Sequence, residues 1–187
     1  MGTPGEHEFA VVDSVEHFDG AILRLHVDTV TMPGGGTATR EVVDHMDAVA
    51  VVALDDAGRV VLLRQYRHPV GERLLELPAG LCDVDGEAPE ATAARELVEE
   101  AGLEADRWEQ VARIIPSPGF STERVTIYLA TGLREVEQPE AEHEEADMEL
   151  VRMPLEEAVD GILDGRVTNG IAVAGLLAAR EHLARRG

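Results

Sequence analysis

The sequence predicts an α+β fold in which a mixed β-sheet is sandwiched between helices and is preceded by a small N-terminal antiparallel β-sheet. Alternating apolar and polar side chains at residues 23–28 are typical of a half-buried strand. Two apolar runs, at residues 48–54 and 60–63, indicate strands buried on both faces, which helices must then cover. Helical periodicity before Gly102 and an apolar run at residues 171–179 supply such helices.

Residues 1–45 form the N-terminal β-sheet region of this prediction. Alternation over residues 8–32 indicates antiparallel strands, and residues 40–45 indicate a third strand that closes the sheet. The glycines at residues 34–36 favour a hairpin loop, because no helix start and no Lys-Ser/Thr pair follows them. Residues 46–187 form the larger domain, which is long enough to bury one good core.

The larger domain begins with a β-hairpin, in which residues 55–58 are the turn between the two apolar strands. Further strands are predicted at residues 74–77, 111–115, 125–130 and 149–153, and helices at residues 155–164 and 169–185. The last helix is predicted to carry, on one face, Ile171, Ala174, Gly175, Ala178 and His182.

A third helix is predicted between Pro89, a residue favoured in the first helical turn, and Gly102, a common C-terminal stop. Its buried stripe is predicted from residues at positions i, i+3, i+4 and i+7, which are Ala94, Leu97, Val98 and Ala101.

Another face of this helix carries three carboxylates, Glu96, Glu99 and Glu100, which lie three and four residues apart. Crowded carboxylates repel one another unless cations neutralise them. Hard oxygen donors of this kind suit Mg²⁺ or Mn²⁺. The alternative is an acidic, solvated helix face without any ligand.

The spacing around this helix resembles the Nudix box, which reads glycine, five residues, Glu, seven residues, Arg-Glu-apolar-x-Glu-Glu-x-Gly-apolar. Glu87 is followed after seven residues by Arg-Glu-Leu-Val-Glu-Glu-Ala-Gly-Leu at residues 95–103, without a gap. Six residues, not five, separate Gly80 from Glu87, so the preceding loop is one residue longer than the pattern. The resemblance implies the Nudix fold and metal-dependent hydrolysis of a nucleoside diphosphate linked to another moiety.

Segments outside the box resemble the actinobacterial ADP-ribose pyrophosphatases of this family. Pro118 lies fifteen residues after Leu103, near the distance at which those enzymes carry a proline. Residues 64–69 and 76–80 match their Arg-Gln-aromatic-Arg and Glu-Leu-Pro-Ala-Gly segments, and residues 143–148 match a late acidic loop. The resemblance implies a homodimer that exchanges N-terminal strands. The N-terminal sheet is also too small to be stable alone.

The resemblance implies a metal site and a catalytic group. Glu96 and Glu100 would hold divalent ions with the main-chain carbonyl of Ala79, and Glu99 would hold a metal or its waters. Arg95 would pair with Glu87 and orient the glutamates of the box. The late loop would supply a residue that contacts metal and activates water, for which Glu145 is the first choice and Glu144 the second, with Glu140 and Glu142 close by.

Substrate contacts are implied for two arginines, with Arg67 clamping the diphosphate and Arg64 reaching it across a dimer interface. Phe120 or Tyr66 would stack on adenine, although either aromatic could instead belong to the core. The remaining implied substrate-binding residues are Glu76, Gly80, Pro118 and Gly119.

The net charge of −21 argues against a nucleic-acid polymer or an anionic membrane as partner, since both need a basic surface. A small phosphate substrate remains compatible, because bound metal supplies positive charge. The single cysteine, Cys82, and the absence of an apolar signal segment lead us to expect a cytoplasmic protein.

The expected reaction is therefore Mg²⁺-dependent hydrolysis of the diphosphate of ADP-ribose to AMP and ribose 5-phosphate. Hydrolysis of another nucleoside diphosphate sugar or of a dinucleotide is the nearest alternative, and a substrate panel separates the two. A non-catalytic ADP-ribose sensor is a third reading. The retained carboxylates count against it, because a sensor has no need of three repelling groups.

Overall fold

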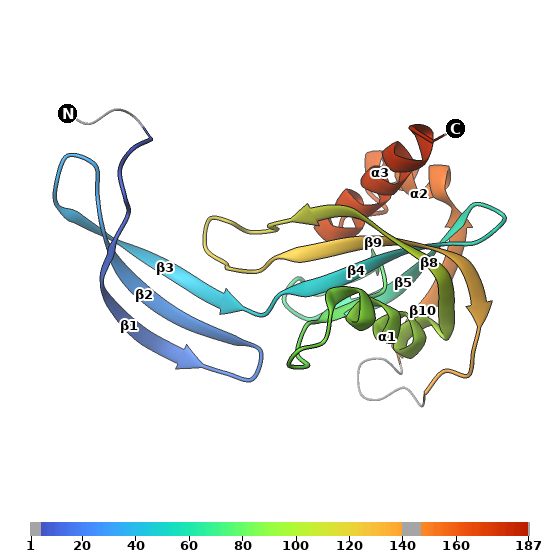
Figure 1. Cartoon of the computed structure of the whole chain (residues 1–187), viewed down its shortest axis with the longest axis horizontal. Coiled ribbons are helices and arrows are strands. Elements are labelled where there is room, and N and C mark those ends of the chain that lie inside the picture. The colour runs from blue at the N-terminus through green and yellow to red at the C-terminus, as the bar shows by residue number, and fades with distance from the viewer. Residues whose placement is uncertain (1–4, 140–146, 187) are drawn as a thin grey trace. The chain divides into compact units, whose positions relative to one another are not determined.

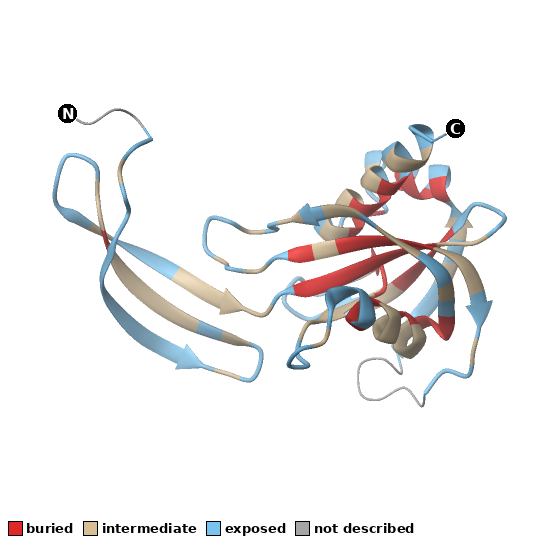
Figure 2. Cartoon of the chain, viewed as in Figure 1, coloured by how far each residue is buried: buried red, intermediate tan, exposed pale blue. Residues whose placement is uncertain are grey.

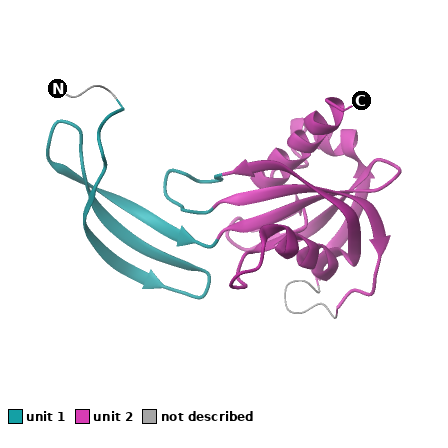
Figure 3. Cartoon of the chain, in the orientation of Figure 1, with its two compact units in different colours: residues 1–46, 115–123 teal, residues 47–114, 124–187 magenta. Residues whose placement is uncertain are grey.

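The computed structural model describes residues 5–139 and 147–186, which fold as two compact units (Figures 1 and 3). Unit 1 consists of residues 1–46 and 115–123, and unit 2 of residues 47–114 and 124–187. The boundary at residue 46 lies one residue beyond the predicted one. Segment 115–123, which we placed in the larger domain, belongs instead to unit 1. The reason is a pair of backbone hydrogen bonds, from Val43 N–H to the carbonyl of Phe120 (2.7 Å) and from Thr122 N–H to that of Val43 (3.0 Å).

Unit 1 contains a three-stranded antiparallel sheet in the order β1-β2-β3. Its strands are β1 (Val11–Asp19), β2 (Leu23–Thr31) and β3 (Thr37–His45), and the glycines between β2 and β3 have positive φ angles, as a tight hairpin loop requires. One expectation is wrong here. Alternation predicted that one face of each strand is buried, but every residue of β1 is exposed in the single chain (Figure 2).

Unit 2 is built on a mixed sheet in the order β10-β5-β4-β9-β8, in which β4 and β9 run parallel. The β4–β5 hairpin pairs at Leu54 and Val60, and further along the two strands pair with β7 and β6, respectively. The strands are β4 (Ala48–Leu54), β5 (Arg59–Arg67), β6 (Glu72–Glu76), β7 (Ala79–Leu81), β8 (Leu103–Ile114), β9 (Val125–Glu135) and β10 (Glu149–Pro154).

Several strands differ from the sequence prediction. β3, β5 and β9 are longer than predicted, β7 was not predicted, and β8 and β6 begin earlier than predicted. β8 begins at Leu103 rather than at residue 111, because the polar residues after Leu103 pair with β9 along the edge of the sheet. β6 begins two residues earlier than predicted, because Glu72 pairs with Arg67 of β5. In both places strand pairing overrides a weak local apolar pattern.

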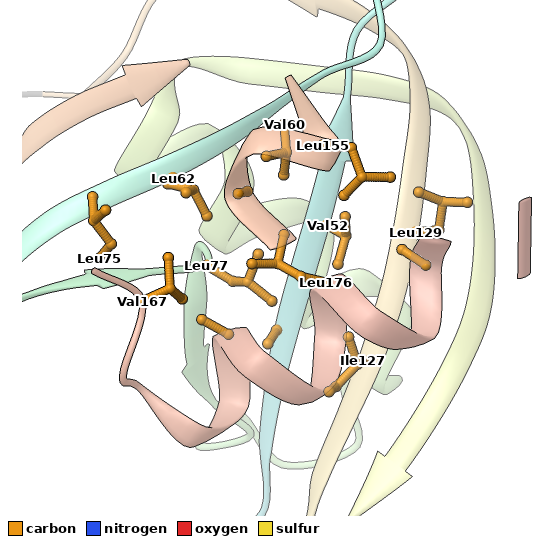
Figure 4. Packing of buried hydrophobic residues seen from close by; sticks show 14 of the residues in the cluster. Val52, Val60, Leu62, Leu75, Leu77, Ile127, Leu129, Leu155, Val167 and Leu176 are labelled. Atoms are coloured by element: carbon orange, nitrogen blue, oxygen red, sulfur yellow. The ribbon is translucent and has the colours of Figure 1, made fainter. Parts of the chain in front are cut away.

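Successive residues of β4 point to opposite faces of the sheet and enter two separate cores. Val52 belongs to the core under α2 (Leu155–Leu163) and α3 (Gly170–Ala184), which Figure 4 shows. Val51 belongs to the core under α1 (Pro89–Ala101) on the other face. Within the described residues, no helix has the length and apolar character needed to cross a membrane.

The buried face of α3 differs from the predicted one. Its buried residues are Ala172, Gly175, Leu176 and Ala179, of which the prediction contained only Gly175. A Cβ at Gly175 would lie 2.5 Å from Cδ1 of Leu77, so glycine permits the close approach of this helix to the sheet. The nearly uniform apolar sequence could not specify which side makes that approach.

Candidate active site

Helix α1 presents the charged residues of the motif at the surface of unit 2. The helix begins at Pro89 and ends at Gly102, whose left-handed φ of 60° lets its N–H reach the carbonyls of Leu97 and Val98. The buried residues are Thr92, Ala93, Leu97 and Ala101. The predicted stripe was therefore correct at Leu97 and Ala101, whereas Ala94 and Val98 are only half-buried.

Gly80 of β7 lies directly against Glu96 of this helix. A Cβ built on Gly80 would be 2.0 Å from the carboxyl carbon of Glu96 and 2.2 Å from its Oε1. A side chain at this position would have to displace the Glu96 carboxylate, so glycine allows the glutamate to rest on the backbone of the sheet. This contact explains why the motif needs glycine at a position where the backbone itself is ordinary extended strand.

Arg95 gathers four carboxylates. Its Nη1 donates to Oε1 of Glu96 (2.7 Å) and to Oε2 of Glu99 (2.9 Å). Its Nη2 lies 3.5 Å from Oε2 of Glu87 and 3.5 Å from Oδ1 of Asp83. One guanidinium thus faces four carboxylates, and the cluster carries excess negative charge. The pairing of Arg95 with Glu87 is the one that the family resemblance implies.

The electrostatics of the cluster are those of a crowded, partly desolvated anion site. Burial raises the pKa of Glu96, and the neighbouring charge of Glu99 raises it further, while Arg95 opposes both effects. Burial tends to lower the pKa of Arg95, but attraction to Glu96 and Glu99 outweighs it and raises that pKa. The raised pKa of Arg95 keeps it charged, and the raised pKa of Glu96 makes a further cation favourable beside its carboxylate.

Glu100 reaches the sheet from the same helix. Its Oε2 accepts a hydrogen bond of 2.8 Å from the N–H of Ala79 in β7. The two implied metal-binding groups, the Glu100 carboxylate and the Ala79 peptide, are therefore adjacent. This hydrogen bond joins the helix to the strand that carries Gly80.

The donor set fits a divalent ion by type and charge. Carboxylate oxygens are the donors that Mg²⁺ and Mn²⁺ prefer, and the cluster has more negative charge than Arg95 can neutralise. Over residues 5–139 and 147–186, no three His, Cys, Asp or Glu side chains already converge as a metal site. Arg95 holds Glu96 and Glu99, so an ion would have to share these carboxylates with it.

A second pair of charged residues lies at the end of β5. Arg67 donates from Nε and Nη2 to the carboxylate of Glu76, at 3.0 Å and 2.7 Å respectively. Glu76 is only 4% exposed, so Arg67 balances a buried charge. Arg64 lies 3.2 Å from Glu149 of β10. The two arginines implied as substrate contacts thus both have carboxylate partners.

The remaining implied residues lie elsewhere. Pro118, Gly119 and Phe120 belong to unit 1, in a turn where Phe120 N–H donates to the Ser117 carbonyl and the Phe120 side chain is exposed. The choices for the late loop, Glu145 and Glu144, lie outside the described residues, as do Glu140 and Glu142.

Two residues of the cluster were missed by sequence reasoning. Asp83 contacts Arg95. The sequence feature that could have identified it is an acidic residue in the loop just before Glu87. Thr92 donates to Glu87 at 2.8 Å, and its signal was a hydroxyl residue five positions after that glutamate. Both act on the box from positions that the motif leaves unspecified.

Several known proteins are similar to this chain. The chain is 55% identical to an ADP-ribose pyrophosphatase of Mycobacterium tuberculosis over 92% of this chain and 84% of that protein. It is 36% identical to a methanol dehydrogenase activator of Bacillus methanolicus, over 86% of each chain. A solved structure described as an ADP compounds hydrolase has the same fold, with a TM-score of 0.86 and 21% identity over 99% of both chains. The NUDIX domain matches residues 44–171, and the chain belongs to the NUDIX family.

Proposed function

We propose that this protein hydrolyses the diphosphate of ADP-ribose to AMP and ribose 5-phosphate in a reaction that depends on Mg²⁺ or Mn²⁺. The observation that carries the reaction class is the cluster in which Arg95 faces four carboxylates beside Gly80 and Ala79. The choice of ADP-ribose is supported by the relative that bears that name at 55% identity over most of the chain.

In the proposed reaction, water adds to one phosphorus of the diphosphate and the P–O bond to the bridging oxygen breaks. Bound Mg²⁺ would neutralise the diphosphate and acidify its water. Glu96, Glu99 and Glu100, with the carbonyl of Ala79, are the proposed holders of the metal. Arg95 is proposed to fix the directions of Glu96 and Glu99. Their carboxylates already lie within hydrogen-bonding distance of its Nη1.

The proton of the attacking water is assigned to a late-loop glutamate. Glu145 is the proposed base and a metal contact, Glu144 is the second choice, and Glu99 is the fallback within the box. A positioned general base contributes about 10²–10⁴-fold to rate. That range sets the size of effect to look for when the glutamates are replaced one at a time.

Substrate recognition is proposed for the residues around the ends of β5 and β6. Glu76 holds the guanidinium of Arg67, which limits the side-chain freedom that binding a diphosphate would otherwise cost. Arg64 is proposed to contact the substrate of the partner subunit. Gly80 and the turn of Pro118, Gly119 and Phe120 complete the proposed substrate contacts.

We also propose a homodimer formed through unit 1. Large apolar side chains are exposed along and beside β1. Monomeric proteins rarely expose so many apolar side chains together, and such a patch marks an interaction surface. The exposed residues are Phe9, Val11, Val12, Val15, Phe18 and Ile22. A second copy of the chain, presenting the same side chains, is the occupant that the family resemblance implies. A cytoplasmic location is proposed with it, in keeping with the single free cysteine.

The test is a substrate panel with Mg²⁺ at saturating concentration. ADP-ribose, other nucleoside diphosphate sugars and dinucleotides are incubated with the protein, and the nucleoside monophosphate released from each is quantified by chromatography. The proposal expects the largest kcat/KM for ADP-ribose, with AMP and ribose 5-phosphate formed in equal amounts. A larger kcat/KM for another member of the panel would overturn the substrate assignment while leaving the reaction class intact.

A further inference from the structure

Thr92 is a buried polar residue whose presence the motif does not explain, because the motif leaves this position unspecified. Among the residues that the structure describes, only Glu76 and Thr92 are polar and buried, and Thr92 is 0% exposed. Glu76 is balanced by Arg67. A buried hydroxyl costs free energy unless it is hydrogen-bonded, so its partner indicates what it does.

The side chain of Cys82 also shares a hydrogen bond with Thr92, but the charged partner of Thr92 is the first glutamate of the box. Its Oγ1 lies 2.8 Å from Oε2 of Glu87 and 3.4 Å from the carbonyl oxygen of Ala88. A hydroxyl has one proton to donate, and the shorter contact to a charged acceptor takes it. The same Oε2 of Glu87 faces Nη2 of Arg95 at 3.5 Å. Thr92 therefore holds the carboxylate oxygen that Arg95 contacts.

This hydrogen bond lies at the N-terminus of the helix, where it can fix how the chain enters the helix. The N-cap is Ala88, whose methyl side chain cannot cap, and Pro89 is the first helical residue. Glu87 and Thr92 thus occupy the N′ and N4 positions, which in many helices pack as a hydrophobic staple that fixes how the chain enters the helix. Here a charge-assisted hydrogen bond joins the two positions, and so places a carboxylate at the start of the helix.

We propose that Thr92 is a positioning residue whose hydroxyl holds Glu87 against Arg95, and thereby sets the carboxylates of Glu96 and Glu99 that the proposed metal needs. Without the hydroxyl, the half-buried carboxylate of Glu87 loses its shortest contact and can turn toward solvent. Among the residues that the structure describes, Asp83 then remains as the partner of Nη2 of Arg95, and the directions in which Arg95 holds Glu96 and Glu99 change. The inference rests on the metal site of the proposed function, and only its activity readout also rests on the proposed substrate.

The test compares two variants that separate the hydroxyl from the packing. Thr92→Val keeps the branched shape and removes the hydroxyl, whereas Thr92→Ser keeps the hydroxyl and removes a methyl group. We expect Thr92→Val to lower kcat about tenfold, and to raise the half-saturating Mg²⁺ concentration several-fold with KM for ADP-ribose little changed. Thr92→Ser should stay within about twofold of wild type in all three. A purely structural role predicts the reverse order, with Thr92→Ser the more damaged variant.

A metal readout that needs no substrate accompanies the kinetics. The Mg²⁺-induced rise in unfolding temperature is measured for wild type, Thr92→Val and Thr92→Ser. A smaller rise in Thr92→Val alone supports the positioning role, even if the wild-type protein leaves ADP-ribose intact and the proposed function fails. Equal rises in all three proteins would overturn the inference.

Glu87→Ala provides the second background. If Thr92 acts through Glu87, this variant should reproduce the loss of Mg²⁺ affinity, and adding Thr92→Val should cause little further loss. Additive losses would show that Thr92 acts by another route and would contradict the inference. If Thr92→Val fails to fold, the result for Glu87→Ala is used by itself. Normal Mg²⁺ affinity in Glu87→Ala would contradict the inference, because Thr92 is proposed to act on the metal site through Glu87.

Discussion

Gly80 and Glu96 are in a contact that only glycine permits, because a Cβ on Gly80 would lie 2.0 Å from the carboxyl carbon of Glu96. The helix that carries Glu96 is fixed on the sheet by fully buried Leu97, so the carboxylate cannot yield by moving the helix. The glycine of β7 and the glutamate of α1 thus define one wall of the proposed metal site. A larger side chain at Gly80 should therefore move the carboxylate of Glu96.

Gly80→Ala should displace the Glu96 carboxylate and lower turnover of ADP-ribose by at least about a hundredfold, the scale of a misplaced catalytic group. Steady-state kinetics give kcat, and circular dichroism reports whether the fold is kept. Gly170→Ala is the matched control, since nothing lies within 4 Å of its added Cβ and its φ is not positive. Normal turnover in Gly80→Ala would mean that the position of Glu96 is unimportant.

Glu100→Gln removes a charge while its amide oxygen can still accept the hydrogen bond from Ala79 N–H. We expect a loss of roughly a thousandfold in turnover, the scale of several kcal/mol of metal-derived stabilisation. The metal-free variant should be at least as stable as wild type in urea unfolding, because one of several repelling charges is gone. Glu104→Gln, at an exposed pair with Arg134, should be silent. If Glu100→Gln turns over normally, Glu100 holds no metal.

Glu145→Gln should leave ADP-ribose binding within a few-fold and reduce turnover by at least about a hundredfold, as expected for a lost general base. Binding is measured calorimetrically in Ca²⁺, and turnover is measured in Mg²⁺. Glu140→Gln and Glu142→Gln should have little effect. A large loss in Glu144→Gln instead would move the base by one residue. Normal turnover in all four variants would return the assignment to Glu99.

In solution the protein should have the mass of two chains of 20.2 kDa at micromolar concentration, as measured by light scattering after gel filtration. Phe18→Lys, on the exposed apolar strand β1, should shift the protein toward monomer because charge would be buried at the contact. Leu163→Lys is the control, since Leu163 is 85% exposed at the end of α2 in the other unit. A single-chain mass for wild type would refute the dimer.

Much of unit 2 could be predicted because its signals are local. The apolar run of β4 was placed at its observed ends, and Pro89 and Gly102 bounded α1 correctly. The carboxylates of the box also follow from spacing, because residues three and four apart share a helix face. The apolar run of β4, the residues that bound α1 and the spacing of its carboxylates, rather than overall composition, predicted these elements.

Other features depend on contacts between distant segments and could not be predicted. The side of α3 that packs is set by Gly175 against Leu77, and a uniformly apolar stretch gives no phase for it. Segment 115–123 joins unit 1 through hydrogen bonds with the backbone of Val43 and His45, and no local sequence pattern pairs such distant residues. Thr92 was overlooked because a threonine is ordinary in sequence and only its burial beside Glu87 makes it informative.

The central claim, that the Arg95 cluster serves a divalent ion in ADP-ribose hydrolysis, is tested most directly by the rate of AMP release with and without metal. The protein is stripped with EDTA, dialysed into metal-free buffer, and assayed as Mg²⁺ or Mn²⁺ is restored. The account predicts no detectable AMP in EDTA and full recovery with either ion, because carboxylate donors accept both. An unchanged rate of AMP release in excess EDTA would contradict it.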